Sequence, residues 1–256
     1  MIFLDALQNY RRYGSLSTTQ DILKAFAIII MMVDHVGYVF YPDELWWRAV
    51  GRIGFPIWFF LAGYAKPSRP PYLILQLCAL MVLTDYCVGE RLFPINALLS
   101  IFCCRLFIAS QLVQQPLTPV NWAFIMLLVV VFAIPSLVIF EYGPQALLFA
   151  LCGYYCRALR HHVLSHVTQA FSFIVFILMQ TDGFQFNLAQ WVFMTVGSGI
   201  VTLYLARFSI KPIEYAAGLG FTRPVINFVS RNSHYVYALH FIAFLALREW
   251  WHHVAP

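Results

Sequence analysis

Long apolar stretches recur along the whole chain, and short polar breaks separate them. The breaks carry prolines or glycines that end helices, such as Pro42, Gly143-Pro144 and Asp182-Gly183. A stretch of about 20 mostly apolar residues is long enough to cross a bilayer as an α-helix. The pattern therefore predicts about nine membrane-spanning helices, over residues 22–41, 50–65, 71–88, 95–112, 121–140, 144–160, 167–181, 188–208 and 233–251.

The composition agrees with this class of protein. The chain is 61% hydrophobic and 11% charged, whereas soluble domains are about 45–50% apolar and about 25% charged. We therefore expect an all-α polytopic membrane protein, a bundle of about nine transmembrane helices with a range of eight to ten. Neither an internal repeat nor a low-complexity linker is visible, so residues 21–256 are expected to form one domain. Residues 1–20 are expected to form a cytoplasmic or surface-lying segment.

Positive charges lie mainly in alternate breaks, and this predicts how the chain crosses the membrane. Cytoplasmic loops of membrane proteins carry an excess of Lys and Arg. With the N-terminus in the cytoplasm, the cytoplasmic segments hold Arg11, Arg12, Lys24, Lys66, Arg69, Arg157, Arg160, Arg207, Lys211, Arg223 and Arg231. The opposite ends hold only Arg48, Arg52, Arg91 and Arg248, with Arg105 near the middle of a span. A cytoplasmic N-terminus is therefore expected.

The charge and cysteine content point away from two other kinds of site. The net charge of +5 comes from dispersed residues, so we expect no nucleic-acid partner. The six cysteines lie mostly within apolar runs and lack the spacing of a zinc site. They are expected to be small buried side chains, and no metal is predicted.

The first apolar run contains the adjacent pair Asp34-His35. Ionisable residues inside a membrane helix are costly, and they are functional candidates by default. Lys24 lies eleven residues before His35, which places both on one helix face about 16 Å apart. Asp34 is rotated by about 100° from His35 around the helix, so it need not be the partner of that histidine.

Other polar residues fall at defined depths of the predicted bundle. Arg52, Asp85, Asn96 and Glu141 lie toward the outer ends of their spans, where they can approach the depth of His35. Structural roles remain open for several candidates: a hydrogen-bonded histidine at His35, a helix-packing pair between Asp34 and Arg52, a headgroup anchor at Arg52, an ion pair at Arg105 and an interhelical hydrogen bond at His240.

Two motifs give the chain a family resemblance. The first helix ends in Met31-Met32-Val33-Asp34-His35, and Gly51-Arg52 is followed by Phe55-Pro56. Later segments are Pro94-Ile95-Asn96, Glu141-Tyr142-Gly143 and a Tyr-x-x-His sequence formed by Tyr237 and His240. Together they resemble the TraX family, multi-spanning membrane proteins associated with N-terminal acetylation of conjugative pilin. This resemblance places the protein in a bacterial inner membrane.

The outline is also similar to the acyltransferase-three membrane superfamily. Those proteins carry a basic residue, ten intervening residues and then a histidine in the first span, and Lys24 and His35 have this spacing. The resemblance implies an acyl-CoA-dependent acyltransferase. Its donor would be acetyl-CoA or another acyl-CoA from the cytoplasm. Its acceptor would be a pilin N-terminus or another peptide, a cell-surface glycan or a lipid-linked sugar.

The resemblance also suggests roles for particular residues. His35 would be the general base, supported by Asp34, and Arg52 would stabilise the oxyanion. The acceptor would be positioned by Asn96, Asp85, Glu141, Tyr237, His240 and Arg105. The phosphates of the CoA donor would be bound by Lys24, Lys66, Arg69 and Arg207. Neither Ser nor Cys lies in an obvious nucleophile motif, so direct transfer is favoured over an acyl-enzyme.

Two other classes of function compete with acyl transfer. A multi-span transporter or flippase would use the same polar residues to line a path, but we find neither sequence repeats nor helices interrupted in matching places. A non-catalytic assembly factor would be expected to lose His35 or Arg52, and both are present. The oligomeric state is not predicted.

Overall fold

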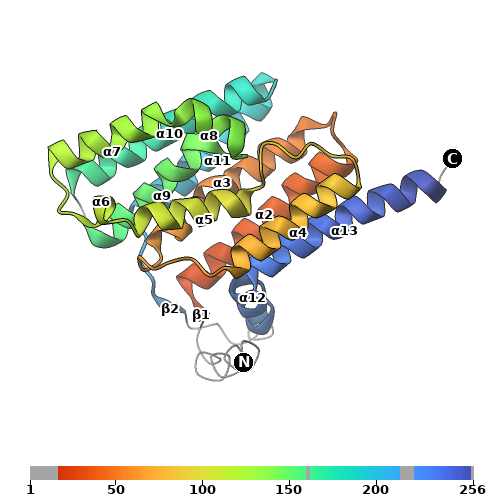
Figure 1. Ribbon diagram of the computed structural model, residues 1–256, viewed down its shortest axis with the longest axis horizontal. Helices are drawn as coiled ribbons and strands as arrows, with labels where there is room; N and C mark the ends of the chain where they lie inside the picture. Colours follow the sequence, from red (N-terminus) through yellow and green to blue (C-terminus); the bar gives the residue numbers. More distant parts are fainter. Residues whose placement is uncertain (1–16, 160–161, 214–221, 255–256) are drawn as a thin grey trace.

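The computed structural model describes residues 17–159, 162–213 and 222–254, and within these it is a bundle of helices (Figure 1). Residues 1–16 of the predicted N-terminal segment, with Arg11 and Arg12, lie outside the described residues, as does Arg160. The elements in chain order are β1 (Ser17–Thr18), α2 (Thr19–Phe40), α3 (Leu45–Tyr64), α4 (Leu73–Cys87), α5 (Ala97–Ile108), α6 (Gln111–Gln114), α7 (Pro119–Val131), α8 (Ala133–Ile139), α9 (Gly143–Ala158), α10 (Val163–Gly183), α11 (Leu188–Ala206), β2 (Pro212–Ile213), α12 (Thr222–Arg231) and α13 (Ser233–Val254).

The start of α2 is fixed by local hydrogen bonds. The Thr18 hydroxyl accepts from the Asp21 backbone, and the Asp21 carboxylate accepts in return from the Thr18 backbone, which is a capping box. Strand β1 pairs with β2 in an antiparallel register. This pairing ties the first turn of α2 to the segment after α11, so Lys24 lies at a well-anchored end of the helix.

Helix α3 is the centre of the bundle. It contacts α2, α5, α9 and α11, and these helices surround it in Figure 1. The contact with α9 is very close, because a Cβ at Gly63 would meet the backbone of Ala150 and a Cβ at Gly153 would meet the backbone of Phe60. Small residues allow two membrane helices to approach at backbone distance. The pair Gly63 and Gly153 therefore sets the position of α3 against α9.

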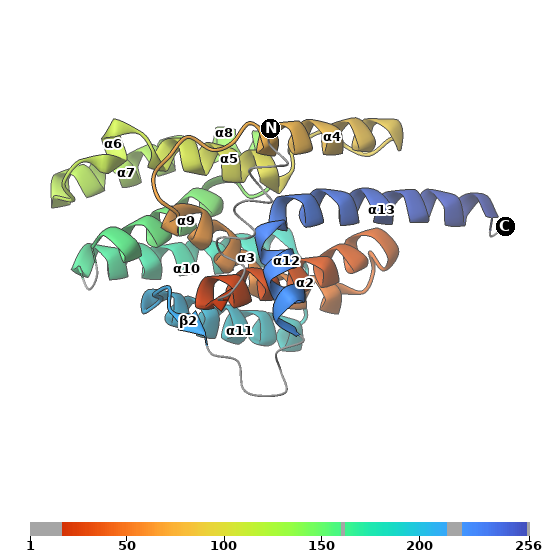
Figure 2. The same ribbon diagram turned by 90° about the horizontal axis from the view of Figure 1, so that it is seen from below.

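The C-terminal helix covers one side of this centre. Helix α13 packs against α2 and α4, and α12 packs against α2. In both ribbon views the last turns of α13 project beyond the rest of the bundle (Figures 1 and 2). The packing brings the middle of α13, with His240, beside the His35 turn of α2.

A helix break and a short bridge position the turn before α9. Helices α7 and α8 are bent by 50° relative to each other. After α8, the backbone of Glu141 donates to Ile95 and the backbone of Ile95 donates to Ile139. These hydrogen bonds hold the turn at Glu141 next to the start of α5, and so next to Asn96.

The segmentation into helices is largely confirmed, but the prediction of nine spans is wrong. By length and composition, three of the described helices could cross a membrane: α2, α10 and α11, with a fourth if α7 and α8 count as one bent span. Helices α4 and α5 have 15 and 12 residues, or about 22 and 18 Å, against a hydrocarbon core of about 30 Å. Helix α9 is almost wholly buried among other helices. Helices α3 and α13 contain Arg, Trp or His side chains, which lower their mean hydropathy.

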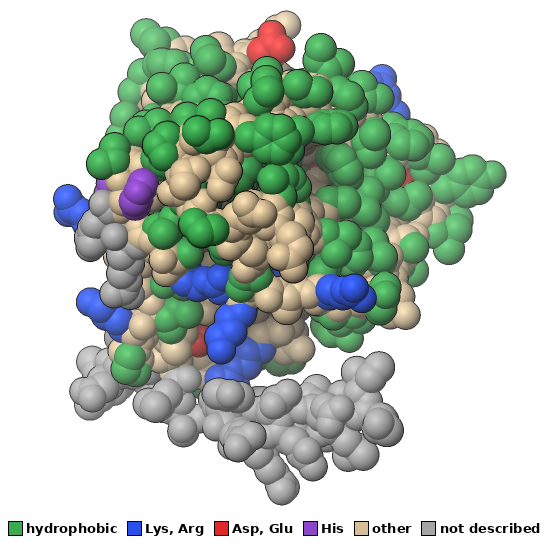
Figure 3. Space-filling view, turned by 60° about the vertical axis from the view of Figure 1, so that its left-hand side comes forward, with side chains coloured by type: hydrophobic (Ala, Val, Ile, Leu, Met, Phe, Trp, Pro, Cys, Tyr) green, Lys and Arg blue, Asp and Glu red, His purple; other side chains and the backbone are tan. Residues whose placement is uncertain are grey.

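The surface nevertheless has the character of a membrane protein. Hydrophobic side chains cover most of the face in Figure 3, and Lys and Arg gather in its lower part. Helices α10 and α11 expose large apolar residues such as Ile174, Leu178, Ile200 and Leu203. Contiguous apolar surface of this kind needs a partner, and the lipid bilayer supplies one.

We predict that Gly153→Ala destabilises the protein by about 1–3 kcal/mol or more, because the added methyl group forces α9 away from the Phe60 backbone. The measurement is the denaturant midpoint of the purified chain in detergent. Gly199→Ala is the control, since its Cβ would meet only Phe173 at 3.4 Å. Equal midpoints for the two variants would contradict the close approach of α3 and α9.

Candidate functional site

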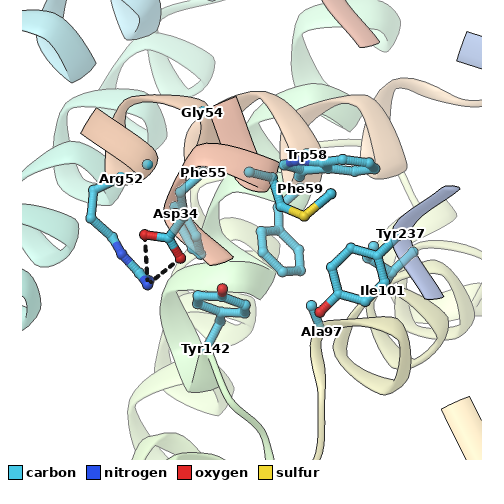
Figure 4. Close-up of a pocket in the computed structure, with 12 residues that line it drawn as sticks. Asp34, Arg52, Gly54, Phe55, Trp58, Phe59, Ala97, Ile101, Tyr142 and Tyr237 are labelled. Carbon is cyan, nitrogen blue, oxygen red and sulfur yellow. Dashed lines mark hydrogen bonds and ion pairs between the residues drawn. The ribbon is translucent and has the colours of Figure 1, made fainter. Parts of the chain in front are cut away.

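A buried ion-pair cluster joins α2 to α3. Arg48 and Arg52 both donate to the Asp34 carboxylate, at 2.6 Å and 3.0 Å to Oδ2. Asp34 and Arg52 are 4% and 5% exposed, and Figure 4 shows their side chains facing each other. Arg48 and Arg52 are one helical turn apart, so one face of α3 presents both guanidinium groups. Two cations therefore share one carboxylate in the interior.

The cluster depends on a glycine in α3. A Cβ at Gly51 would overlap the Asp34 side chain, including its carboxylate. Glycine at this position therefore lets the Asp34 turn of α2 lie directly against α3. The two motifs of the sequence, Asp34-His35 and Gly51-Arg52, meet here in space.

His35, the next residue of α2, lines the same cavity as Arg48 and Arg52 and contacts α13. Its Nδ1 lies 2.8 Å from His240 Nε2, and His240 Nδ1 lies 2.7 Å from the Val236 carbonyl oxygen. A carbonyl only accepts, so His240 Nδ1 must donate to it. Neutral His240 then has an acceptor at Nε2, and His35 donates from Nδ1. With these hydrogen-bond directions, neutral His35 carries its proton on Nδ1 and its lone pair on Nε2.

Both histidines are held tightly by their surroundings. His35 is 5% exposed and His240 is 8% exposed. Their rings lie side by side and nearly parallel, with an angle of 8° and centroids 5.0 Å apart, and Tyr237 and Phe241 contact His35 edge-on. The ring of His35 therefore has one packed orientation, with its Nδ1 side turned toward α13.

The cavity next to His35, here called the polar vestibule, is the largest of those at the site. Its volume is about 570 Å³, within the range of small-molecule sites, about 300–1,000 Å³. Six of the predicted site residues line it: His35, Arg52, Asp85, Asn96, Glu141 and Tyr237. The sequence therefore identified a group of residues that the fold brings together around one cavity.

Glu141 is an acidic residue of the vestibule that interacts electrostatically with Arg48 and Arg52. It lies in the turn between α8 and α9, where burial raises its pKa, while Arg52 and Arg48 oppose this effect. Burial and the two arginines therefore act on the pKa of Glu141 in opposite directions, and burial has the larger effect.

A second cavity, here called the basic cavity, lies at the other end of α2. It has a volume of about 70 Å³ and is lined by Lys24, Arg105 and His234 from three different helices. None of its lining residues is acidic. Within the described part of the chain, the Nδ1 atom of His234 is buried and has no hydrogen-bond partner. The cavity is suited to a negatively charged group.

A narrow central cavity of about 30 Å³ lies between these two (Figure 4). It shares Trp58 and Ile101 with the basic cavity, and Arg52, Tyr142 and Tyr237 with the polar vestibule. Helix α2 contributes to all three in order: Lys24 to the basic cavity, Met31 and Asp34 to the central cavity and His35 to the vestibule. The three cavities therefore form a series along one helix.

One N–H group of Arg52, a residue that lines both the central cavity and the vestibule, is not used within the part of the protein that the structure describes. Its Nη2 atom binds Asp34, but its Nε atom is buried and, among the described residues, finds no hydrogen-bond partner. Its guanidinium group lies over the ring of Phe184, 4.9 Å from the centroid, and over that of Tyr142, 5.6 Å from the centroid. A fixed cation with an unused N–H can bind an anionic atom in the adjoining cavities.

The remaining predicted residues lie elsewhere. Arg105 is not beside His35. It lines the basic cavity and donates to the Ser68 hydroxyl. This contact places the Lys66–Arg69 loop near the basic cavity, although neither Lys66 nor Arg69 lines it. Arg207 is the C-cap residue of α11 and lines none of the three cavities.

Four residues of the site were not predicted from the sequence: Arg48, Trp58, Tyr142 and His234. Arg48 was counted only as a charge at the outer end of a span, yet its spacing of four residues from Arg52 could have identified it. Tyr142 stood within a quoted motif without a role. Trp58 and His234 carry no local signal, because only the packing of α3, α5 and α13 places them at the cavities.

Within the described ranges, no group of three or more His, Cys, Asp or Glu side chains could hold a metal ion. The expectation of a metal-free site stays a prediction.

We predict that Asp34→Asn destabilises the protein by about 3–5 kcal/mol, because the substitution removes the carboxylate that forms ion pairs with both guanidinium groups. The unfolding midpoint in detergent measures this. The control is Glu249→Gln, which removes the more exposed Arg248–Glu249 pair and should cost about 0–1 kcal/mol. If Asp34→Asn unfolded like the control, the cluster would not hold α2 to α3.

Comparison with known proteins places the chain. A family model described as "TraX protein" matches residues 19–248. An uncharacterized protein of Rickettsia prowazekii (strain Madrid E) is 32% identical over 89 residues, which are 35% of this chain and 36% of that protein. The chain thus matches about a third of the length of this relative. No solved structure shows a significant match.

The region matched by the family model runs from the first turn of α2 to the last turns of α13. It contains the arginine cluster, both histidines and all three cavities. It covers most of the 256 residues. The chain therefore belongs to the TraX family.

Proposed function

We propose that the protein is a membrane acyltransferase that moves an acyl group, most simply acetyl, from an acyl-CoA to an acceptor. The acceptor is an amine or hydroxyl of a peptide, a glycan or a lipid-linked sugar. The protein acts in the bacterial inner membrane, with its N-terminus and basic cavity on the cytoplasmic side. The basis for this orientation is the distribution of Lys and Arg along the chain.

The observation that carries the proposal is the series of three cavities along α2. A basic cavity at one end suits the phosphates of a CoA donor. A polar vestibule at the other end can admit an acceptor. Lys24 and His35 lie on one continuous helix, about 16 Å apart. A long thin pantetheine arm can span this distance and bring its thioester to His35.

The proposed reaction is a direct transfer. His35 Nε2 takes the proton from the acceptor N–H or O–H as the acceptor atom attacks the thioester carbonyl carbon. The developing oxyanion is stabilised by Arg52, whose Nε–H is free to donate. The C–S bond then breaks, and the CoA thiolate takes the proton from His35. The products are the acylated acceptor and free CoA thiol.

His240 supports this role of His35. By donating to Val236 and accepting from His35, it favours the tautomer that has the lone pair on Nε2. It also delocalises the positive charge that appears on His35 when the proton arrives. His240 is therefore a positioning residue, and its effect acts through His35.

Donor entry requires movement in the centre of the bundle. A volume of about 30 Å³ holds roughly one or two water molecules, which is less than a pantetheine arm needs. Trp58 stands between the basic and central cavities and donates to the Ala27 carbonyl at 3.3 Å. Rotation of its indole ring away from this long hydrogen bond opens the path.

A transporter or flippase is the competing function, because cavities in series also suit a pathway. The two differ in chemistry, since only an acyltransferase releases thiol from acetyl-CoA. The fixed orientation of His35 by His240 favours proton transfer over simple passage, because a pathway has no need for one histidine tautomer.

We predict that His35→Ala lowers acetyl transfer by about 10²–10⁴-fold, the usual contribution of a positioned base. His240→Ala should lower kcat by roughly tenfold or more while the KM for acetyl-CoA is kept, since only the orientation of the base is lost. The assay follows thiol release from acetyl-CoA and incorporation of labelled acetyl in inverted membrane vesicles that contain the overproduced protein.

The matched control for both variants is His166→Gln, an exposed residue of α10, which should retain wild-type rates. Transfer at the full rate by a folded His35→Ala variant would rule out the mechanism. Wild-type vesicles that release no thiol and incorporate no label would favour the transporter.

We also predict that the basic cavity selects donors that carry phosphates. S-Acetylpantetheine has the same thioester and arm but no phosphate groups. Its kcat/KM should therefore be lower than that of acetyl-CoA. Arg105→Gln should reduce the ratio of the two kcat/KM values, acetyl-CoA over S-acetylpantetheine, by roughly ten- to a hundredfold. This is the value of one hydrogen bond to a charged group.

Arg157→Gln, at the end of α9, is the charge-matched control for Arg105→Gln, because Arg157 lines none of the three cavities. An equal preference for the two donors in the wild-type protein would place the donor phosphates elsewhere, even if acyl transfer itself were confirmed.

A further inference from the structure

A fourth hollow, here called the lateral groove, lies outside the proposed reaction path. It has a volume of about 290 Å³ and lies between α5, the α7–α8 break and α9. Figure 2 shows α5, α7 and α8 together along one side of the molecule. The groove occupies a face of α5 next to the one that lines the central cavity, since Ser100 and Cys104 line the groove while Ala97 and Ile101 line the central cavity. None of the described residues that line it is charged.

One polar group in the groove has no partner. Ser100 is 3% exposed, and its hydroxyl makes no hydrogen bond within the part of the chain that the structure describes. The Ser136 hydroxyl, across the groove, is satisfied by the Ala133 carbonyl. A buried hydroxyl without a partner costs about 1–3 kcal/mol. The groove therefore offers one hydrogen-bond donor within otherwise apolar walls.

The mouth of the groove opens toward lipid. Phe132 lines the groove and is 60% exposed, and Val131 and Ile134 beside it are 59% and 77% exposed. These apolar residues surround the break between α7 and α8. An occupant therefore enters from the hydrocarbon region of the bilayer, and neither water nor a water-soluble ligand reaches the groove easily.

The size of the groove selects among apolar occupants. An α-helix of a partner protein is about 10–12 Å wide, too wide for a hollow of this volume. A single hydrocarbon chain is thin and flexible enough to enter beside Phe132. The ester carbonyl at the head of a phospholipid acyl chain is also the acceptor that the Ser100 hydroxyl lacks.

We propose that the lateral groove binds one acyl chain of a membrane phospholipid, and that the Ser100 hydroxyl donates to its ester carbonyl. The bound chain fills the space left by the helix break and braces α5 against the start of α9. Helix α5 carries Ala97 and Ile101 of the central cavity, and α9 carries Gln145 of the vestibule, so the site supports the reaction centre from outside. The proposal is independent of the acyl-transfer mechanism.

The test uses the full-length protein in nanodiscs that contain phosphatidylethanolamine with a photoactivatable diazirine in one acyl chain. After irradiation, peptide mass spectrometry locates the crosslinks. We expect crosslinks on α5 and α8 to exceed those on the lipid-exposed faces of α10 and α11 several-fold, and to decrease when unlabelled phosphatidylethanolamine is added in excess. Equal crosslinking of all lipid-facing helices would overturn the proposal.

Two variants and a control make the test specific. Cys103→Trp fills the groove and should remove the crosslinks on α5 and α8 while it leaves those on α10 and α11. Ser100→Ala keeps the volume and should lower the groove crosslinks by about two- to tenfold, the effect of one hydrogen bond. Val120→Trp, at the exposed start of α7 and away from the mouth of the groove, should change neither.

Thermal unfolding in detergent identifies variants that fail to fold. Ser100→Ala changes a single atom in an apolar wall, so it keeps the proposal testable if the bulky variant Cys103→Trp is unstable. Groove crosslinks that persist at wild-type level in both folded variants would overturn the site.

Discussion

The structure depends on the sharing of one buried carboxylate by two arginines. Asp34 on α2 binds Arg48 and Arg52 on α3, and its carboxylate offsets the cost of burying both guanidinium groups. Burying three charges in a low-dielectric interior costs a large desolvation free energy. The attraction between the charges offsets this cost only if their positions are well defined. This requirement fixes the register of α2 against α3, and Gly51 supplies the space for it.

The other features of the site follow from that register. With Asp34 turned toward α3, His35 is turned toward α13, where His240 sets its tautomer. The same rotation directs Met31 to the central cavity and Lys24 to the basic cavity. One ion-pair cluster thus aligns the three cavities along α2. It also leaves Arg52 Nε, where the central cavity and the vestibule meet, without a partner among the residues that the structure describes. The charge cluster has a structural role first, and the proposed chemistry uses the donor that remains.

The sequence predicted the helices better than the spans. Apolar runs located most helices within a few residues, but they could not show that α9 is surrounded by other helices or that α4 and α5 are short. Helix α12 was missed, because it has ten residues and lies where a break was expected. Hydropathy measures how apolar a segment is, and it does not distinguish burial in protein from burial in lipid.

The site was predictable where it follows from helix geometry. The shared face of Lys24 and His35, and the rotation of Asp34 away from it, both come from the period of the α-helix. Arg105 was expected near the acceptor, yet α5 runs from Asn96 at the vestibule to Arg105 at the basic cavity, a rise of about 14 Å. His234 and Trp58 depend on long-range packing that no local pattern records.

The most direct measurement is the structure of the full chain with a non-hydrolysable acetyl-CoA analogue, determined by electron cryo-microscopy. The account predicts that the phosphates lie in the basic cavity against Lys24 and Arg105, that the pantetheine arm passes a rotated Trp58, and that the carbonyl carbon lies beside His35 Nε2 and Arg52. Phosphates bound in the polar vestibule, or an acyl group remote from His35, would contradict it.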